Sequence, residues 1–154
     1  MRVTLERSNL LKSLNHVHRV VERRNTIPIL SNVLLSASGA SLEMKATDLD
    51  LEVTEATGAN IEQSGATTVP AHLLYDIVRK LSDGAEVMLK VDESGNSMSV
   101  VSGRSSFRLQ CLPQADFPEL SAGSFSHIFR LDSQALKGLI EKTQFAISTE
   151  ETRY

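Results

Sequence analysis

The chain has 154 residues, of which 41% are hydrophobic and 23% charged, and its formal net charge at pH 7 is −3. This length fits one domain, or one domain and part of another, and the longest uncharged apolar stretch, at 27–35, is too short to cross a membrane. Because Cys111 is the only cysteine, an internal disulfide and a zinc site with several thiolates are excluded, which favours a reducing, cytoplasmic environment.

Positive charge is concentrated near the N-terminus. Residues 1–24 hold six basic side chains against two acidic ones, whereas 43–62 hold six acidic side chains and one lysine. A signal peptide would need an apolar stretch where these charges stand, so the sequence predicts no secretion. A net negative charge argues against nucleic-acid binding, but this distribution allows one basic surface to hold a polyanion while the remainder repels it.

The first residues predict a strand at 2–6 and a helix at about 9–20, with Ser8 as its N-cap. A stripe of apolar residues has the spacing of a buried helix face, and it consists of Leu10, Leu11, Leu14, Val17 and Val21. The opposite side carries a basic stripe, formed by Lys12, His16, Arg19 and Arg23. Such a stripe is usually a solvated face. The alternative is contact with nucleic-acid phosphates, without base stacking because aromatic residues are few.

The middle of the chain predicts antiparallel strands around a second helix. Strands are expected at 32–38, 41–47, 48–56, about 59–63, 85–92, 97–103 and 105–112, and the second helix at about 71–81. In 48–56 strict alternation predicts inward leucines and an outward acidic face. That face, with Asp48, Asp50 and Glu52, is either solvated or a metal or acid–base site.

Two segments carry more apolar residues than a single buried face requires. Leu73 stands beside Leu74 on the second predicted helix, whose stripe is formed by Leu74, Ile77, Val78 and Leu81. Phe107 and Leu109 lie on a predicted strand near Arg104 and Arg108. These residues predict either ordinary core or a subunit interface with an apolar centre and an arginine rim, and the spacing leaves both open.

The order of elements predicts an α+β fold with antiparallel sheets and two packed helices, because no alternation of parallel strands and helices is present. After a turn-rich linker at 113–124, "FRLDSQALKGL" (129–139) echoes the first strand and helix, and "SQALKGL" matches "SNLLKSL" at an offset of 125 residues. A repeat with this period indicates successive similar domains. No nucleophile motif, phosphate-binding loop or chelating histidine pair supports an enzyme, a metal site or a cofactor.

Five stretches, in this order, resemble the family of the bacterial DNA polymerase III beta subunit, the replicative sliding clamp. They are "IPILSNVLL" (27–35), "ATDLDLEV" (46–53), "GATTVPAHLLYDIVRKL" (65–81), "SGRSSFRLQCLPQADFP" (102–118) and "FRLDSQALKGLIEKTQFAIS" (129–148). The resemblance implies the DNA clamp fold, with two helices on two small antiparallel sheets per domain. It implies clamp domain I at 1–124 and the start of domain II at 125–154.

The resemblance also implies a function that is not catalytic. A homodimeric ring would encircle double-stranded DNA without reading its sequence, and would dock the DNA polymerase III alpha subunit, other polymerases, the clamp loader and repair proteins. The residues implied to contact DNA are Arg24, Lys12, Arg7, Arg79 and Lys137. Those implied at the dimer interface are Leu73, Ile77, Arg104, Phe107 and Leu109, and those at the edge of the partner-peptide pocket are Arg153 and Tyr154. Beside this stand two alternatives: a docking module that uses the basic first helix, and an enzyme with the acidic strand as its metal site.

Overall fold

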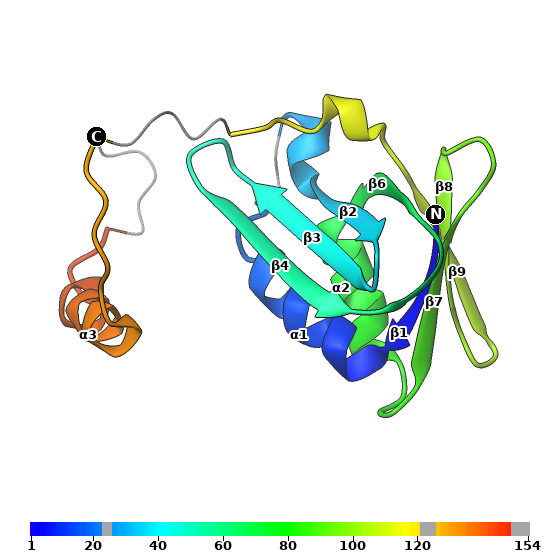
Figure 1. Cartoon of the computed structure of the whole chain (residues 1–154), viewed down its shortest axis with the longest axis horizontal. Coiled ribbons are helices and arrows are strands. Elements are labelled where there is room, and N and C mark those ends of the chain that lie inside the picture. The colour runs from blue at the N-terminus through cyan, green and yellow to red at the C-terminus, as the bar shows by residue number, and fades with distance from the viewer. Residues whose placement is uncertain (23–25, 121–125, 149–154) are drawn as a thin grey trace. The chain divides into compact units, whose positions relative to one another are not determined.

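The computed structural model describes residues 1–22, 26–120 and 126–148, and the chain forms two compact units, Met1–Leu120 and Ser121–Tyr154 (Figure 1). The described strands are β1 (Arg2–Glu6), β2 (Asn32–Ser38), β3 (Ser41–Thr47), β4 (Glu52–Gly58), β5 (Asn60–Gln63), β6 (Gly65–Pro70), β7 (Glu86–Val91), β8 (Ser97–Ser102) and β9 (Ser105–Gln110). The helices are α1 (Arg7–Val17), α2 (Ala71–Lys80) and α3 (Ser133–Gln144), with short 3₁₀ turns at Pro28–Ser31 and Gln114–Asp116. None of these helices is long and apolar enough to span a membrane.

Two antiparallel sheets make up the first unit. The five-stranded sheet has the order β5-β1-β7-β8-β9, and the four-stranded sheet has the order β4-β3-β2-β6. Helices α1 and α2 pack against each other, and they contact the four-stranded sheet through β3 and β4 on one side and β2 and β6 on the other (Figure 1). The predicted α+β architecture with two helices and two antiparallel sheets is therefore confirmed.

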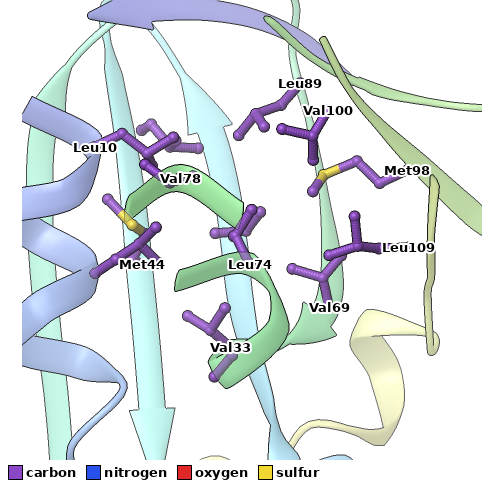
Figure 2. Packing of buried hydrophobic residues seen from close by; sticks show 14 of the residues in the cluster. Leu10, Val33, Met44, Val69, Leu74, Val78, Leu89, Met98, Val100 and Leu109 are labelled. Carbon is purple, nitrogen blue, oxygen red and sulfur yellow. The ribbon is translucent and has the colours of Figure 1, made fainter. Parts of the chain in front are cut away.

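The core of the first unit lies where the helix stripes meet the inward residues of both sheets (Figure 2). Leu10 and Leu14 of α1 and Leu74 and Val78 of α2 are completely buried. Alternate residues of the strands complete the core, among them Val33, Leu35, Met44, Leu89 and Met98. Burial of one such side chain contributes about 1.5–3 kcal/mol. The helical stripes, and the alternating patterns at 32–38 and 41–47, thus identify these buried faces correctly.

The first helix differs from the prediction at both ends. It begins at Arg7, directly after β1, and Ser8 does not cap it, because its hydroxyl donates a hydrogen bond of 2.8 Å to Glu6 Oε1. The helix ends at Val17, and the next residue, His18, donates from Nδ1 to the carbonyl of Leu14 at 2.8 Å. Because the helix ends three residues early, Arg19 lies in the following turn.

The prediction of a strand through 48–51 is wrong. These residues form a turn in which the Asp48 carboxylate accepts hydrogen bonds from the backbone N–H groups of Asp50 (3.0 Å) and Leu51 (2.7 Å). Leu49 has a φ of 83° and is exposed, as is Leu51, so neither leucine points into the core. An aspartate that bonds to its own backbone two or three residues ahead offers an alternative to strand pairing, and β4 starts only at Glu52.

In the second unit the echo of the first helix is confirmed, but the strand expected at 129–132 is not formed. Asp132 instead caps α3, because its carboxylate accepts hydrogen bonds of 3.0 Å from the N–H groups of both Gln134 and Ala135. In the first unit β1 pairs with both β5 and β7, whereas the described residues 126–148 contain no strand with which 129–132 could pair. A strand needs such a partner for its backbone hydrogen bonds.

Candidate nucleic-acid and subunit interfaces

The predicted basic stripe of α1 is only partly free to meet a ligand. Lys12 and Arg19 are exposed and make no ion pair within the described residues. His16 is also exposed, but its Nδ1 lies 2.6 Å from Glu55 Oε1 on β4, so one of its two ring nitrogens is directed to the sheet. Arg23 and Arg24 lie outside the described residues. Lys12 and Arg19 therefore remain as cations available on this surface.

Arg7 has a structural role that its sequence position does not reveal. Its Nε donates to the carbonyl of Val78 at 3.1 Å and its Nη2 to the carbonyl of Arg79 at 2.7 Å, and its Nη1 pairs with Asp83. Only 13% of the side chain is exposed. The guanidinium thus occupies the C-terminal end of α2, where backbone carbonyls have no partner within the helix and a cation is favoured. These contacts direct the guanidinium to the fold itself, and a contact between Arg7 and DNA stays a prediction.

Replacement of Arg7 by methionine should therefore lower the free energy of unfolding by about 1–3 kcal/mol, since it removes charge-assisted hydrogen bonds at the C-terminal end of α2. Urea denaturation of the chain, followed by circular dichroism, measures the change. Lys12→Met is the matched control, because it also removes one cation but no described contact, and its effect should stay within about 0.5 kcal/mol. Equal losses in the two variants would contradict a capping role for Arg7.

Two stacked aromatic rings connect the C-terminal end of α1 with α2. The rings of His18 and Tyr75 are stacked, with centroids 3.9 Å apart and an interplanar angle of 7°. The guanidinium of Arg79 lies 5.6 Å from the centroid of the Tyr75 ring and donates to Asp76 Oδ1 at 3.1 Å. Arg79 stays half-exposed, but its charge is partly offset by Asp76. The spacing of Tyr75 and Arg79 on one helix could have revealed their contact, whereas no sequence signal connects Tyr75 to His18.

An exposed apolar patch lies between α2 and β9. Leu73, Ile77, Leu81 and Phe107 line a hollow of about 320 Å³, and Asp76, Lys80 and Ser105 complete its lining. Leu73 is 48% exposed and Phe107 is 40% exposed, and together with their neighbours they form one contiguous apolar surface. We call Leu73, Ile77, Leu81 and Phe107 the α2–β9 patch. The structure thus brings together three of the predicted interface residues, namely Leu73, Ile77 and Phe107.

The other two predicted interface residues occupy different environments. Arg104 lines a separate hollow of about 230 Å³ together with Lys80 and Ser105, two residues that also line the patch. Leu109 is only 1% exposed and packs in the core, where Figure 2 shows it near Met98, its cross-strand neighbour. In the single chain the side chain of Leu109 is therefore part of the core, and its place at a subunit interface stays a prediction.

The acidic residues at 48–52 do not form a metal site. Asp48 is engaged in its own turn, and Glu52 Oε1 lies 3.2 Å from Lys45 Nζ. Within residues 1–22, 26–120 and 126–148, no three histidine, cysteine or acidic side chains are placed to hold a metal ion. Burial raises the pKa of the Cys111 thiol, so this cysteine stays protonated and behaves as a small core residue.

The remaining predicted residues belong to the second unit. Lys137 is exposed on α3, and its Nζ lies 3.7 Å from Glu141 Oε1, one turn further along the helix. An exposed pair of this kind contributes little to stability and leaves the ammonium accessible. Arg153 and Tyr154, the predicted edge of a peptide pocket, lie outside the described residues, so their role stays a prediction.

Known proteins that resemble this chain match it over its whole length. Residues 1–121 match the family described as DNA polymerase III beta subunit, N-terminal domain. The chain is 53% identical over 154 residues to the beta sliding clamp of Caulobacter vibrioides and 41% identical over 155 residues to that of Escherichia coli K12. It aligns over its whole length in both cases, but spans only 41% and 42% of these relatives.

Solved structures give the same result. A DnaN sliding clamp from Bartonella birtlesii, bound to griselimycin, aligns with a TM-score of 0.92 and 64% identity. A DnaN sliding clamp from Pseudomonas aeruginosa aligns with a TM-score of 0.91 and 39% identity. In each case the alignment covers 100% of this chain, and 41% and 42% of the solved chains.

Proposed function

This chain belongs to the DNA polymerase III beta subunit family, and we propose that its full-length subunit is a sliding clamp that makes the replicative polymerase processive. Two subunits would close into a ring around double-stranded DNA. In this proposal clamp domain I would comprise 1–124, including the unit Met1–Leu120, and 125–154 would begin domain II. This function needs no cofactor and no catalytic residue, and its place is the cytoplasm, where DNA is replicated in bacteria.

The observation that carries this proposal is the sparse cationic surface of the helices in a chain with a net charge of −3. Lys12, Arg19 and Arg79 are exposed on or next to α1 and α2, and two of them make no described ion pair. For each phosphate contact, the logarithm of the DNA-binding constant falls by roughly 0.9 per unit increase in the logarithm of the salt concentration. A few such contacts would therefore orient the DNA without fixing the ring at one place. Lys137 would add a contact from the second unit, as Arg24 would from the first. Ring closure, rather than affinity, would then retain the DNA.

This mechanism predicts that retention depends on the shape of the DNA. Full-length subunit loaded by its clamp loader on a nicked circle should remain bound when the salt concentration is raised, because screening removes the phosphate contacts but does not open the ring. The same complexes, cut once with a restriction enzyme after loading, should lose the protein by sliding off the ends. Gel filtration of labelled protein with DNA measures both. Equal loss from circular and linear DNA would rule out the topological mechanism.

The α2–β9 patch supports a place for this domain in ring closure. Leu73, Ile77 and Phe107 would form the apolar centre, and Arg104 and Lys80 a charged rim, the arrangement found in stable subunit interfaces. In addition, β9 is an edge strand of the five-stranded sheet, with backbone groups on its outer side that a strand of the second subunit could pair with. The interface would thus combine side-chain burial with sheet extension.

Partner proteins are also part of the proposal. The DNA polymerase III alpha subunit, the clamp loader, other polymerases and repair proteins would dock on a pocket whose edge includes Arg153 and Tyr154. A docking module that uses α1 alone is not favoured, because the sliding clamps match this chain from end to end. A docking module of this kind would also give the α2–β9 patch no role.

A further inference from the structure

A row of cationic side chains crosses the outward face of the five-stranded sheet. The strand registers pair Arg2 with Lys90, Lys90 with Ser99, and Ser99 with Arg108, so these four residues lie in one line across β1, β7, β8 and β9. Their chain neighbours Val3, Leu89, Met98, Val100 and Leu109 are buried in the core. Because successive residues of a strand point to opposite faces, the line of four faces away from the core. We call Arg2, Lys90, Ser99 and Arg108 the cationic row.

The arrangement of charge in the cationic row is unfavourable for the sheet itself. Arg2 and Lys90 stand directly opposite each other, and like charges in that position destabilise a pair of strands. Arg2 is compensated by Glu62 of β5, with 3.2 Å between Nε and Oε2. Lys90 and Arg108 are exposed and form no ion pair within the described residues. Two cations on this face, Lys90 and Arg108, are thus free to meet an external anion as far as the described part of the chain shows.

The surface next to the cationic row is concave. A hollow of about 820 Å³ is lined by Arg2, Lys90, Ser99 and Arg108 together with Gln63 and the 92–95 turn. The hollow therefore presents several hydrogen-bond donors: two guanidinium groups, an ammonium group, the hydroxyl groups of Ser94 and Ser99, and an amide. Lys90 and Arg108 are two strands apart, or about 10 Å at the usual strand spacing. Long side chains at this separation can each reach a different carboxylate of one extended segment.

Two acidic residues in the same hollow help to define the ligand. Asp92 is already engaged, since its carboxylate accepts hydrogen bonds from the Ser97 backbone N–H (3.3 Å) and hydroxyl (2.9 Å). Glu93 is exposed and without an ion pair among the described residues. It would repel a continuous phosphate backbone, and no aromatic side chain lines the hollow to stack a base. A peptide with separate carboxylates can instead avoid Glu93 and still reach Lys90 and Arg108.

We propose that the cationic row binds an acidic, extended segment of a partner protein, with Lys90 and Arg108 as its carboxylate contacts and Ser99 as a hydrogen-bond donor between them. This proposal goes beyond the ring, because it uses side chains on the outward face of the five-stranded sheet and neither the helix surface nor the α2–β9 patch. Arg108 shares β9 with the edge proposed for the ring interface, but its side chain stands on the sheet face. The carboxylates of the segment would supply the charge that the fold leaves unmatched.

The test uses a fluorescein-labelled peptide of alternating glutamate and serine, the glutamine counterpart of that peptide, and an oligothymidylate of similar length. Fluorescence anisotropy at low salt measures their binding to the 154-residue chain. Only the glutamate peptide should bind, and Lys90→Gln with Arg108→Gln should weaken it about fivefold, since two exposed charge contacts are lost. Lys12→Gln with Arg19→Gln removes the same charge from the helix surface, and should change the affinity less than about twofold.

Equal weakening by the two double variants would overturn the proposal, because binding would then follow net charge alone. So would equal binding of the glutamine peptide, or tighter binding of oligothymidylate through Lys90 and Arg108. A second measurement avoids variants altogether. In the unaltered chain, the amide NMR signals of Lys90, Ser99 and Arg108 should shift on addition of the glutamate peptide, and shifts confined to α1 would contradict the site.

Discussion

Leu74→Ala should lower the free energy of unfolding of the first unit by about 3 kcal/mol, whereas Leu73→Ala, one residue earlier, should lower it by about 1 kcal/mol or less. The two residues are adjacent on α2 but face different surroundings. Leu74 is completely buried between the helices and the sheets (Figure 2), and its truncation leaves a cavity there. Leu73 is half-exposed at the α2–β9 patch, so its truncation removes surface that already contacts water.

Urea denaturation of the 154-residue chain, followed by circular dichroism, measures both changes under the same conditions. The pair is its own control, because both substitutions replace leucine by alanine in the same helix and therefore change helix propensity equally. Similar losses for Leu73→Ala and Leu74→Ala would contradict the assignment of one residue to the core and the other to an exposed interface.

Phe107→Ala in the full-length subunit should weaken the ring dimer by about 2–4 kcal/mol, which corresponds to roughly a 30- to 1,000-fold rise in the dissociation constant. Phe107 is a large aromatic side chain of the patch and is 40% exposed in the single chain. Burial of this surface by a second subunit would contribute only to association. The stability of the isolated first unit should therefore change much less than the stability of the dimer.

Sedimentation equilibrium over a dilution series measures the dissociation constant. Leu51→Ala is a suitable control, since Leu51 is also an exposed apolar residue but lies in the 48–51 turn, away from α2 and β9. An unchanged dissociation constant in Phe107→Ala would exclude the patch from the interface. A wild-type subunit that stays monomeric would argue against the ring and favour the docking-module alternative.

Several elements could be read directly from the sequence. The alternating runs at 32–38 and 41–47 coincide with β2 and β3, because each combines one buried face with a turn at Gly39. The apolar stripes of α1 and α2 identify Leu10, Leu14, Leu74 and Val78 as core. Both signals are local, since a strand or helix that buries one face must repeat apolar residues at its own period.

The errors arose where a side chain makes a hydrogen bond to a residue only a few positions away in the chain. Asp48 accepts hydrogen bonds from the next residues and forms a turn, although the leucines around it alternate as in a strand. Ser8 bonds to the Glu6 carboxylate and so does not cap α1. The same residues are compatible with a strand or helix cap and with a local side-chain hydrogen bond. The sequence does not show which of these hydrogen bonds is made.

The sequence by itself determined the two-helix α+β fold, the buried faces and the family, because periodicity and ordered motifs are properties of the chain. Only the tertiary structure decided which charges are free. Arg7 donates a hydrogen bond to Val78 at the end of α2, 71 residues away, and His16 contacts Glu55, 39 residues away. Lys90, by contrast, stands opposite Arg2 on the neighbouring strand. An ion pair depends on where distant backbone segments come together, and that position follows from packing of the whole unit rather than from the spacing of residues within one element.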